Sequence, residues 1–173
     1  MNKLKLLFTG GGGAGTQLLY ETLSDKYEVH FADGSDDLDV ISNNVPLKHK
    51  HKIPMANDLN FVESLGDLIK KNNIQILIPG VDEELVKINE LNNLCPNLKI
   101  ICPQKSFIEK MLNKKNMSDL FSEHDILSPK SYKIEEIVDG NSYIIKPKVG
   151  RGSRGVVSVN SKSQILSYFK LLY

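Results

Sequence analysis

The chain has 173 residues, of which 40% are hydrophobic and 25% are charged, and its formal net charge is +1. A chain of this size buries roughly 70% of its unfolded surface, which is enough for a real core. The composition excludes low-complexity disorder, and no apolar run approaches the roughly 20 residues of a membrane-spanning helix. The apolar start is too short for a signal peptide, so we expect a cytoplasmic protein.

Charge is distributed unevenly along the chain. The first 105 residues are net acidic, the remainder is net basic, and both arginines, Arg151 and Arg154, lie in one glycine-rich segment. Such a local basic loop indicates a small anion, whereas a nucleic-acid surface would need a broad basic stripe with interleaved aromatic residues. We therefore expect neither nucleic acid nor membrane as a partner. The two cysteines, Cys95 and Cys102, have no disulfide or metal spacing and are expected to be reduced core thiols.

Strand-like and helix-like segments alternate through residues 1–104. Four segments predict strands, at 4–9, 27–33, 74–78 and 98–102, and the apolar runs at 74–78 and 98–102 are expected to be buried. Three amphipathic segments predict helices, at 17–23, 58–72 and 82–93. Because this alternation builds a parallel sheet with right-handed crossovers, the expected fold class is α/β with a Rossmann-like doubly wound sheet.

The pattern changes after Pro103. Three further helices are predicted, at 106–112, 116–124 and 161–172. Two strands, at 142–147 and 155–159, flank a glycine-rich loop and predict a hairpin. Residues 105–173 are therefore expected to form a small α+β lobe rather than to continue the parallel sheet.

A glycine cluster follows the first predicted strand. Gly10, Gly12 and Gly15 match G-x-G-x-x-G at a helix start, and Asp33 lies 18 positions beyond Gly15. Glycine lets phosphate approach backbone N–H groups and Asp can hold a ribose hydroxyl, so an NAD(P)-binding module or reductase is one alternative. We favour a tight strand-to-helix turn, since no Tyr precedes a Lys by four positions as in short-chain reductases. The lysine of a P-loop is also missing.

The segment 143–156, Tyr-Ile-Ile-Lys-Pro-Lys-Val-Gly-Arg-Gly-Ser-Arg-Gly-Val, is the most informative part of the chain. Lys146 ends an apolar strand, and a loop rich in Gly, Ser and Arg follows. Such a loop can close over nucleotide phosphates, because small residues let backbone amides approach and basic groups offset negative charge. The alternative is an exposed hairpin, which seldom carries this density of Lys, Arg and Gly.

Three stretches of the sequence together resemble the ATP-grasp superfamily, most closely ligases like the carbamoyl-phosphate synthase large chain. Residues 3–33 are similar to that family's preceding α/β domain, and Ile78-Pro79-Gly80-Val81-Asp82-Glu83-Glu84-Leu85 resembles its strand-end motif. The third stretch runs from Asn113-Lys114 through Pro129 to Val156 and contains the Ile-Ile-Lys-Pro strand before the glycine loop. The sequence departs from the family pattern at Asn113, where Asp is usual, and at Asp125, where Gly is common.

The resemblance implies a role for each matching residue. Lys114 would contact the ATP phosphates first and Lys146 second, near the α- and β-phosphates, while Lys115 competes for the first role. The loop over the terminal phosphates would comprise Gly150, Gly152, Ser153 and Gly155, with Arg151 assisting. Four residues could face a substrate at the carboxyl edge of the first sheet: Gly12, Asp82, Glu83 and Glu84. A solvated helix start is an equal alternative for the two glutamates.

The resemblance further implies an ATP-dependent ligase that uses Mg²⁺. A small-molecule carboxylate would be activated as an acyl phosphate and attacked by an amine or similar nucleophile. Residues 1–104 would be the pre-ATP-grasp domain and 105–173 the first lobe of a truncated ATP-grasp domain, with the metal ligands in a second lobe. We expect no metal site in this chain. A homodimer, or a non-catalytic interaction fragment, is the alternative that an incomplete lobe favours.

The polar segment 34–57 contains a His-x-His pair, His49 and His51, inside the lysine run 48–52. A metal site would need a third ligand, none is evident nearby, and the positive charge opposes a cation. A solvated loop is therefore predicted here. His30 and His124 have no partners that can be recognised from the sequence.

Overall fold

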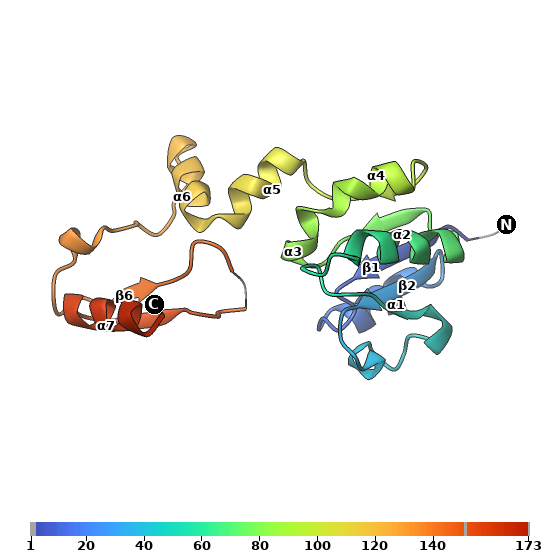
Figure 1. Ribbon diagram of the computed structural model, residues 1–173, viewed down its shortest axis with the longest axis horizontal. Coiled ribbons are helices and arrows are strands. Elements are labelled where there is room, and N and C mark those ends of the chain that lie inside the picture. Colours follow the sequence, from blue (N-terminus) through green and yellow to red (C-terminus); the bar gives the residue numbers. More distant parts are fainter. Residues whose placement is uncertain (1–2, 151, 173) are drawn as a thin grey trace. The chain divides into compact units, whose positions relative to one another are not determined.

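The chain folds into two compact units, Met1–Lys105 and Ser106–Tyr173 (Figure 1). The structure is a computed structural model that describes residues 3–150 and 152–172. Arg151, which was expected in the glycine loop, lies outside the described residues. Among the residues that are described, no helix is long and apolar enough to cross a membrane.

The first unit is built on a five-stranded parallel sheet in the order β3-β2-β1-β4-β5. Its strands are β1 (Lys5–Thr9), β2 (Glu28–Asp33), β3 (Lys50–Lys52), β4 (Ile76–Ile78) and β5 (Lys99–Ile100). Its helices are α1 (Thr16–Leu23), α2 (Phe61–Asn72), α3 (Asp82–Leu85) and α4 (Leu91–Leu94), with 3₁₀ turns η1 (Leu38–Val40), η2 (Leu47–His49) and η3 (Ile88–Glu90). The predicted α/β class with a parallel sheet is confirmed.

Helices and turns cover both faces of this sheet. Because side chains along a strand alternate between the two sides, each strand can contribute residues to both cores. One face packs under α2 and α4 through Leu7, Ala32, Phe61, Leu65, Leu77 and Leu91. The other face packs against α1 and η1 through Val29, Phe31, Ile41 and Val45, with Tyr20 and Leu38 at the margin. The central strands β1 and β4 fit the apolar runs of the sequence. The run 98–102, predicted as a buried strand, instead forms the short edge strand β5 and leaves Ile101 52% exposed.

Two predicted elements of the first unit are wrong. The polar segment is not a solvated loop throughout, because Lys50–Lys52 forms the edge strand β3 and pairs in parallel with β2. Lys50 is itself buried, and its Nζ donates to the carbonyl of Ile41 at 2.8 Å. The helix predicted over 82–93 is divided into α3, η3 and α4. This stretch contains Val86, Ile88 and three asparagines, which are weaker helix formers than Ala or Leu.

The second unit combines helices with a hairpin. Its elements are α5 (Lys105–Leu112), α6 (Lys114–Glu123), η4 (Ile134–Glu136), β6 (Tyr143–Ile145), β7 (Val157–Val159) and α7 (Lys162–Leu172). Strands β6 and β7 pair antiparallel, which confirms the predicted hairpin. Ile165 of α7 packs on Val159 and Ile137, with Tyr143 and Ile145 at the edge of this small core.

Candidate functional site

The strand order of the first unit reverses direction between β1 and β4, since β2 and β3 lie beyond β1 and β5 lies beyond β4. Open parallel sheets bind ligands at this point, just outside the carboxyl ends of the strands. Two turns occupy that position. Residues 10–15 follow β1, and residues 79–81 lead from β4 into α3.

These two turns pack closely against each other. A Cβ on Gly80 would overlap the carbonyl oxygen of Thr9, and one on Gly10, where φ is +67°, would lie 2.9 Å from the side chain of Val81. The Thr9 hydroxyl accepts from the Gly80 N–H at 3.0 Å and donates to the carboxylate of Glu84. The turns after β1 and β4 are thereby joined into one packed edge.

The acidic residues after Gly80 differ in their surroundings. Glu84 is buried and bonded to Thr9, so it does not belong to a solvated helix start. Asp82 and Glu83 are exposed at the first turn of α3. Substrate contact at this edge therefore remains a prediction for Asp82 and Glu83, while Glu84 has a bonding role in holding the turn.

Asp33 and Gly12 are bonded to each other. The N–H of Gly12 donates to Asp33 Oδ2 at 2.8 Å, and that of Ser35 donates to Oδ1 at 2.9 Å. A Cβ on Gly12 would lie 3.1 Å from Val40 and 3.2 Å from Asp33 Oδ2. The Asp33 carboxylate thus accepts a hydrogen bond from an N–H group that a dinucleotide pyrophosphate would use. This arrangement favours the tight-turn interpretation of the glycine cluster.

In the second unit, the glycine loop joins β6 to β7. Lys146 is exposed and directly follows β6. Gly152, Ser153 and Gly155 have positive φ values of +61°, +58° and +69°, a conformation that glycine adopts without steric cost. The hydroxyl of Tyr168 on α7 donates to the Gly155 carbonyl at 3.0 Å and holds the loop's second end.

The start of α6 contacts the glycine loop. The N–H of Lys114 donates to the Lys148 carbonyl at 2.8 Å, and its Nζ donates to the Gly150 carbonyl at 2.5 Å. Lys115 instead pairs with Asp119, 2.6 Å away on the same helix. Of the two neighbouring lysines, Lys114 is the one that brings its charge to the loop.

Asn113 stands where the family pattern has Asp, and its side chain still caps helix α6. Its side-chain oxygen accepts from the N–H groups of Lys115 at 3.0 Å and Asn116 at 3.3 Å, so it caps α6 as Asp would. The cap sets the position of Lys114, which is the first residue of the helix. Two lysines and a glycine-rich backbone within one unit form a set suited to binding phosphate.

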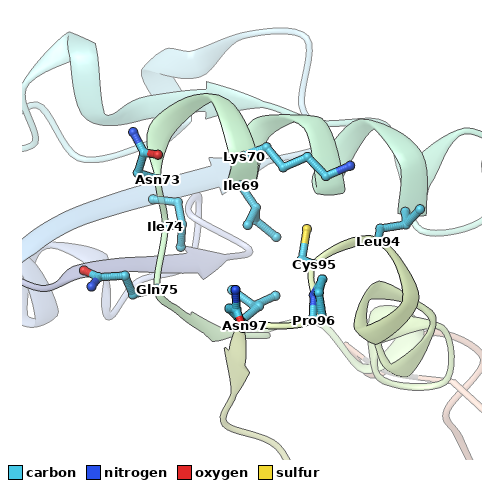
Figure 2. A pocket seen from close by; sticks show the side chains of 10 residues that line it. Ile69, Lys70, Asn73, Ile74, Gln75, Leu94, Cys95, Pro96 and Asn97 are labelled. Atoms are coloured by element: carbon cyan, nitrogen blue, oxygen red, sulfur yellow. The ribbon is translucent and has the colours of Figure 1, made fainter.

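A hollow of about 480 Å³ lies elsewhere in the first unit (Figure 2). It is lined by the end of α2 and by residues that precede β4 and β5, among them Ile69, Asn73, Gln75 and Cys95. It therefore lies at the amino edge of the sheet, opposite the glycine turns. None of the predicted site residues lines it, and we assign it no function.

The structure brings together a histidine cluster that sequence reasoning missed. His30 Nδ1 lies 2.8 Å from His51 Nε2, and His30 Nε2 lies 3.1 Å from Glu28 Oε1. His49 Nε2 lies 3.8 Å from the same oxygen. The prediction of a solvated loop around His49 and His51 is wrong. His30, for which the sequence showed no recognisable partner, contacts both His51 and Glu28. Glu28-x-His30 and His49-x-His51 carry the two-residue period of neighbouring strands, which was the available signal.

Comparison with known proteins gives structural but not sequence matches. Neither a protein-family model nor a curated protein matches the chain. The biotin carboxylase domain of 2-oxoglutarate carboxylase from Hydrogenobacter thermophilus matches with a TM-score of 0.67 and 16% identity, over 100% of this chain and 41% of that one. N5-carboxyaminoimidazole synthase from Aspergillus clavatus matches with a TM-score of 0.62 and 16% identity, over 99% and 44%. L-amino acid ligase from Bacillus licheniformis matches with a TM-score of 0.58 and 13% identity, over 99% and 43%.

These neighbours are ATP-grasp enzymes, so the fold is one found in the ATP-grasp superfamily, as the sequence resemblance implied. At 13–16% identity the likeness concerns the fold alone. The chain spans less than half the length of each of the three structures. The closer likeness to the carbamoyl-phosphate synthase large chain stays a prediction.

Proposed function

We propose that this chain is the N-terminal part of an ATP-grasp ligase, with residues 1–104 as the preceding domain and 105–173 as the first lobe. The reaction would activate a small-molecule carboxylate with ATP as an acyl phosphate, which an amine or similar nucleophile then attacks. Two of the similar structures were solved with ADP, one of them with magnesium. Carbamoyl-phosphate synthase large chain-like chemistry is the finer proposal, supported by the three sequence stretches quoted above.

The observation that carries this proposal is the bonding of Lys114 to the glycine loop that begins at Lys146. The two hydrogen bonds from Lys114 to Lys148 and Gly150 join the start of α6 to the segment that would cover the phosphates. Positive side chains held beside backbone N–H groups act by stabilising charge on the transferred phosphoryl group rather than by covalent chemistry. The loop backbone bends at Gly152, Ser153 and Gly155, where φ is positive, and such bends can expose backbone N–H groups to a phosphate.

The same residues do not fit Mg²⁺. This ion prefers oxygen ligands, chiefly carboxylates and phosphates, whereas the loop and the start of α6 offer lysines. We therefore propose that Mg²⁺ is held by ATP and by residues outside this chain. A homodimer belongs to the proposal because the 2-oxoglutarate carboxylase domain is a dimer. A cytoplasmic location also belongs to it, in keeping with the unbridged thiols of Cys95 and Cys102.

The test is Lys146→Ala in the full-length protein, measured as carboxylate-dependent release of ADP from ATP. Loss of a positive contact to the transferred phosphoryl group should lower kcat by roughly a hundredfold or more. Lys114→Ala should lower it similarly. Lys115→Ala is the matched control, since its side chain pairs with Asp119, and it should stay within about twofold. Retained turnover in Lys146→Ala would sink the assignment.

A further inference from the structure

Four ionisable side chains meet on one face of the first sheet. Glu28 and His30 alternate along β2, His51 lies on the neighbouring strand β3, and His49 ends the η2 turn just before it. Ala32, two residues beyond His30, packs in the core under α2, which identifies the face. The glycine loop of the proposed ATP site belongs to the other unit, so the two sites share no residue.

The spacing of the donor atoms suits a metal ion. One ligand atom each from Glu28, His30 and His49 lies within 4.8 Å of the other two. Two of the separations are 3.1 Å and 3.8 Å, both measured to Glu28 Oε1. Metal–nitrogen and metal–oxygen bonds of about 2.0–2.1 Å in a tetrahedral site place donors roughly 3.3 Å apart. Small side-chain rotations therefore suffice to enclose an ion.

The burial of the rings also suits coordination. His30 has only 3% of its side chain exposed. The other ring nitrogen of His49, Nδ1, is buried with no hydrogen-bond partner among the described residues, so a water would satisfy it.

Positive charges around the cluster act against a cation. Lys5 pairs with Glu28 Oε1 at 3.0 Å. Lys48 electrostatically disfavours positive charge at His30 and His49, and Lys71 of α2 does so at His51. The side chain of Lys5 is 31% exposed, so its ammonium can move into water and release the carboxylate. These lysines weaken binding without blocking the donor atoms.

We propose that Glu28, His30 and His49 bind one divalent transition-metal ion of the Zn²⁺ class, with His51 as the outer partner that orients His30. The His30 Nδ1–His51 Nε2 hydrogen bond directs the other ring nitrogen of His30 toward Glu28, as the outer partners of zinc-bound histidines do. Two imidazoles and one carboxylate select this class over Mg²⁺ and Ca²⁺, which prefer oxygen alone. The ion would fasten the three-residue edge strand β3 to β2.

The experiment titrates the untagged chain with ZnCl₂ by calorimetry near neutral pH, with Co²⁺ as a spectroscopic substitute. We expect one ion per chain and the visible absorption of tetrahedral Co²⁺. His49→Ala and Glu28→Gln should each weaken Zn²⁺ binding by roughly 10–100-fold and abolish the Co²⁺ spectrum. Glu28→Gln keeps the side-chain shape, so it also serves if His49→Ala folds poorly. His124→Ala, which removes the histidine of the second unit, should bind like the unmodified chain.

Several results would overturn the proposal. These are the absence of Zn²⁺ binding at submillimolar concentrations, unchanged affinity in both Glu28→Gln and folded His49→Ala, or loss of binding in His124→Ala. Thermal unfolding gives a second measurement, since an ion that binds only the folded chain raises its Tm. Zn²⁺ should raise the Tm and Mg²⁺ should not. Equal stabilisation by both ions would exclude a nitrogen-ligand site.

Discussion

Gly80 has no Cβ, and this lets the turns after β1 and β4 approach each other closely at the carboxyl edge of the sheet. Its backbone lies so close to Thr9 that a Cβ would overlap the Thr9 carbonyl oxygen, while its N–H donates to the Thr9 hydroxyl. Gly15, at the start of α1, is different, because a Cβ there would meet nothing within 4 Å and its φ is −83°. Two glycines of neighbouring turns therefore have opposite tolerance for a methyl group.

Gly80→Ala should destabilise the first unit by roughly 1–3 kcal/mol, because the added carbon forces the backbones of the two turns apart. Gly15→Ala should change stability by less than about 1 kcal/mol, since the site is open and the backbone conformation is ordinary. Thermal unfolding followed by circular dichroism compares the two variants. Equal losses in both would show that the close approach at Thr9 is not the constraint.

Helix α6 depends on its cap more than on its core. It spans ten residues, none of which is buried, and a helix this short is marginal on its own. The Asn113 side chain satisfies two of its first N–H groups, and the Lys114 N–H is satisfied by the Lys148 carbonyl. The cap and the glycine loop together fix the residue that is proposed to contact phosphate.

Asn113→Ala should loosen the first turn of α6 at a cost of about 1 kcal/mol, because two backbone N–H groups lose their acceptor. Amide hydrogen exchange at Lys115 and Asn116 should speed up by roughly fivefold for that free energy. Asn113→Asp keeps an acceptor in the same place and should retain the slow exchange. Fast exchange in both variants would mean that the side chain does not act as the cap.

The two units carry different parts of the proposed ligase. The sheet edge with Asp82 and Glu83 belongs to the first, and Lys114, Lys146 and the glycine loop belong to the second. The similar ATP-grasp structures are more than twice as long as this chain, which covers 41–44% of them. Phosphate contacts from exposed lysines yield only about 0–1 kcal/mol each in water. A nucleotide site normally buries most of its ligand, and this requires further protein surface.

The 173-residue chain should therefore bind MgATP weakly, with a Kd near or above about 1 mM, which corresponds to roughly −4 kcal/mol. Calorimetry of the chain with MgATP measures this directly. The Lys146→Ala chain is the control that identifies any heat arising at the glycine loop. A Kd in the low-micromolar range for the unmodified chain would show that these two units, alone or as a dimer, already enclose the nucleotide.

Patterns along the chain were sufficient for the elements whose burial is regular. The short segments before Gly10, Gly34 and Pro79 predicted β1, β2 and β4, because strands covered on both faces are rich in apolar residues. Lys146 and the glycines after it could be recognised because that hairpin loop is one continuous segment. Each of these features is determined by neighbours in sequence.

Features that depend on distant partners could be decided only by the folded structure. β3 has the polar sequence Lys-His-Lys and is a strand because β2 pairs with it. Asp33 bonds to Gly12 across 21 positions, and His30 meets His51 across the same interval. Lys114 differs from Lys115 because the loop 36 residues later supplies its acceptor. The type of a residue limits which groups its side chain can bind. The partner that it actually contacts depends on strand order and helix packing, and these cannot be read from a local sequence pattern.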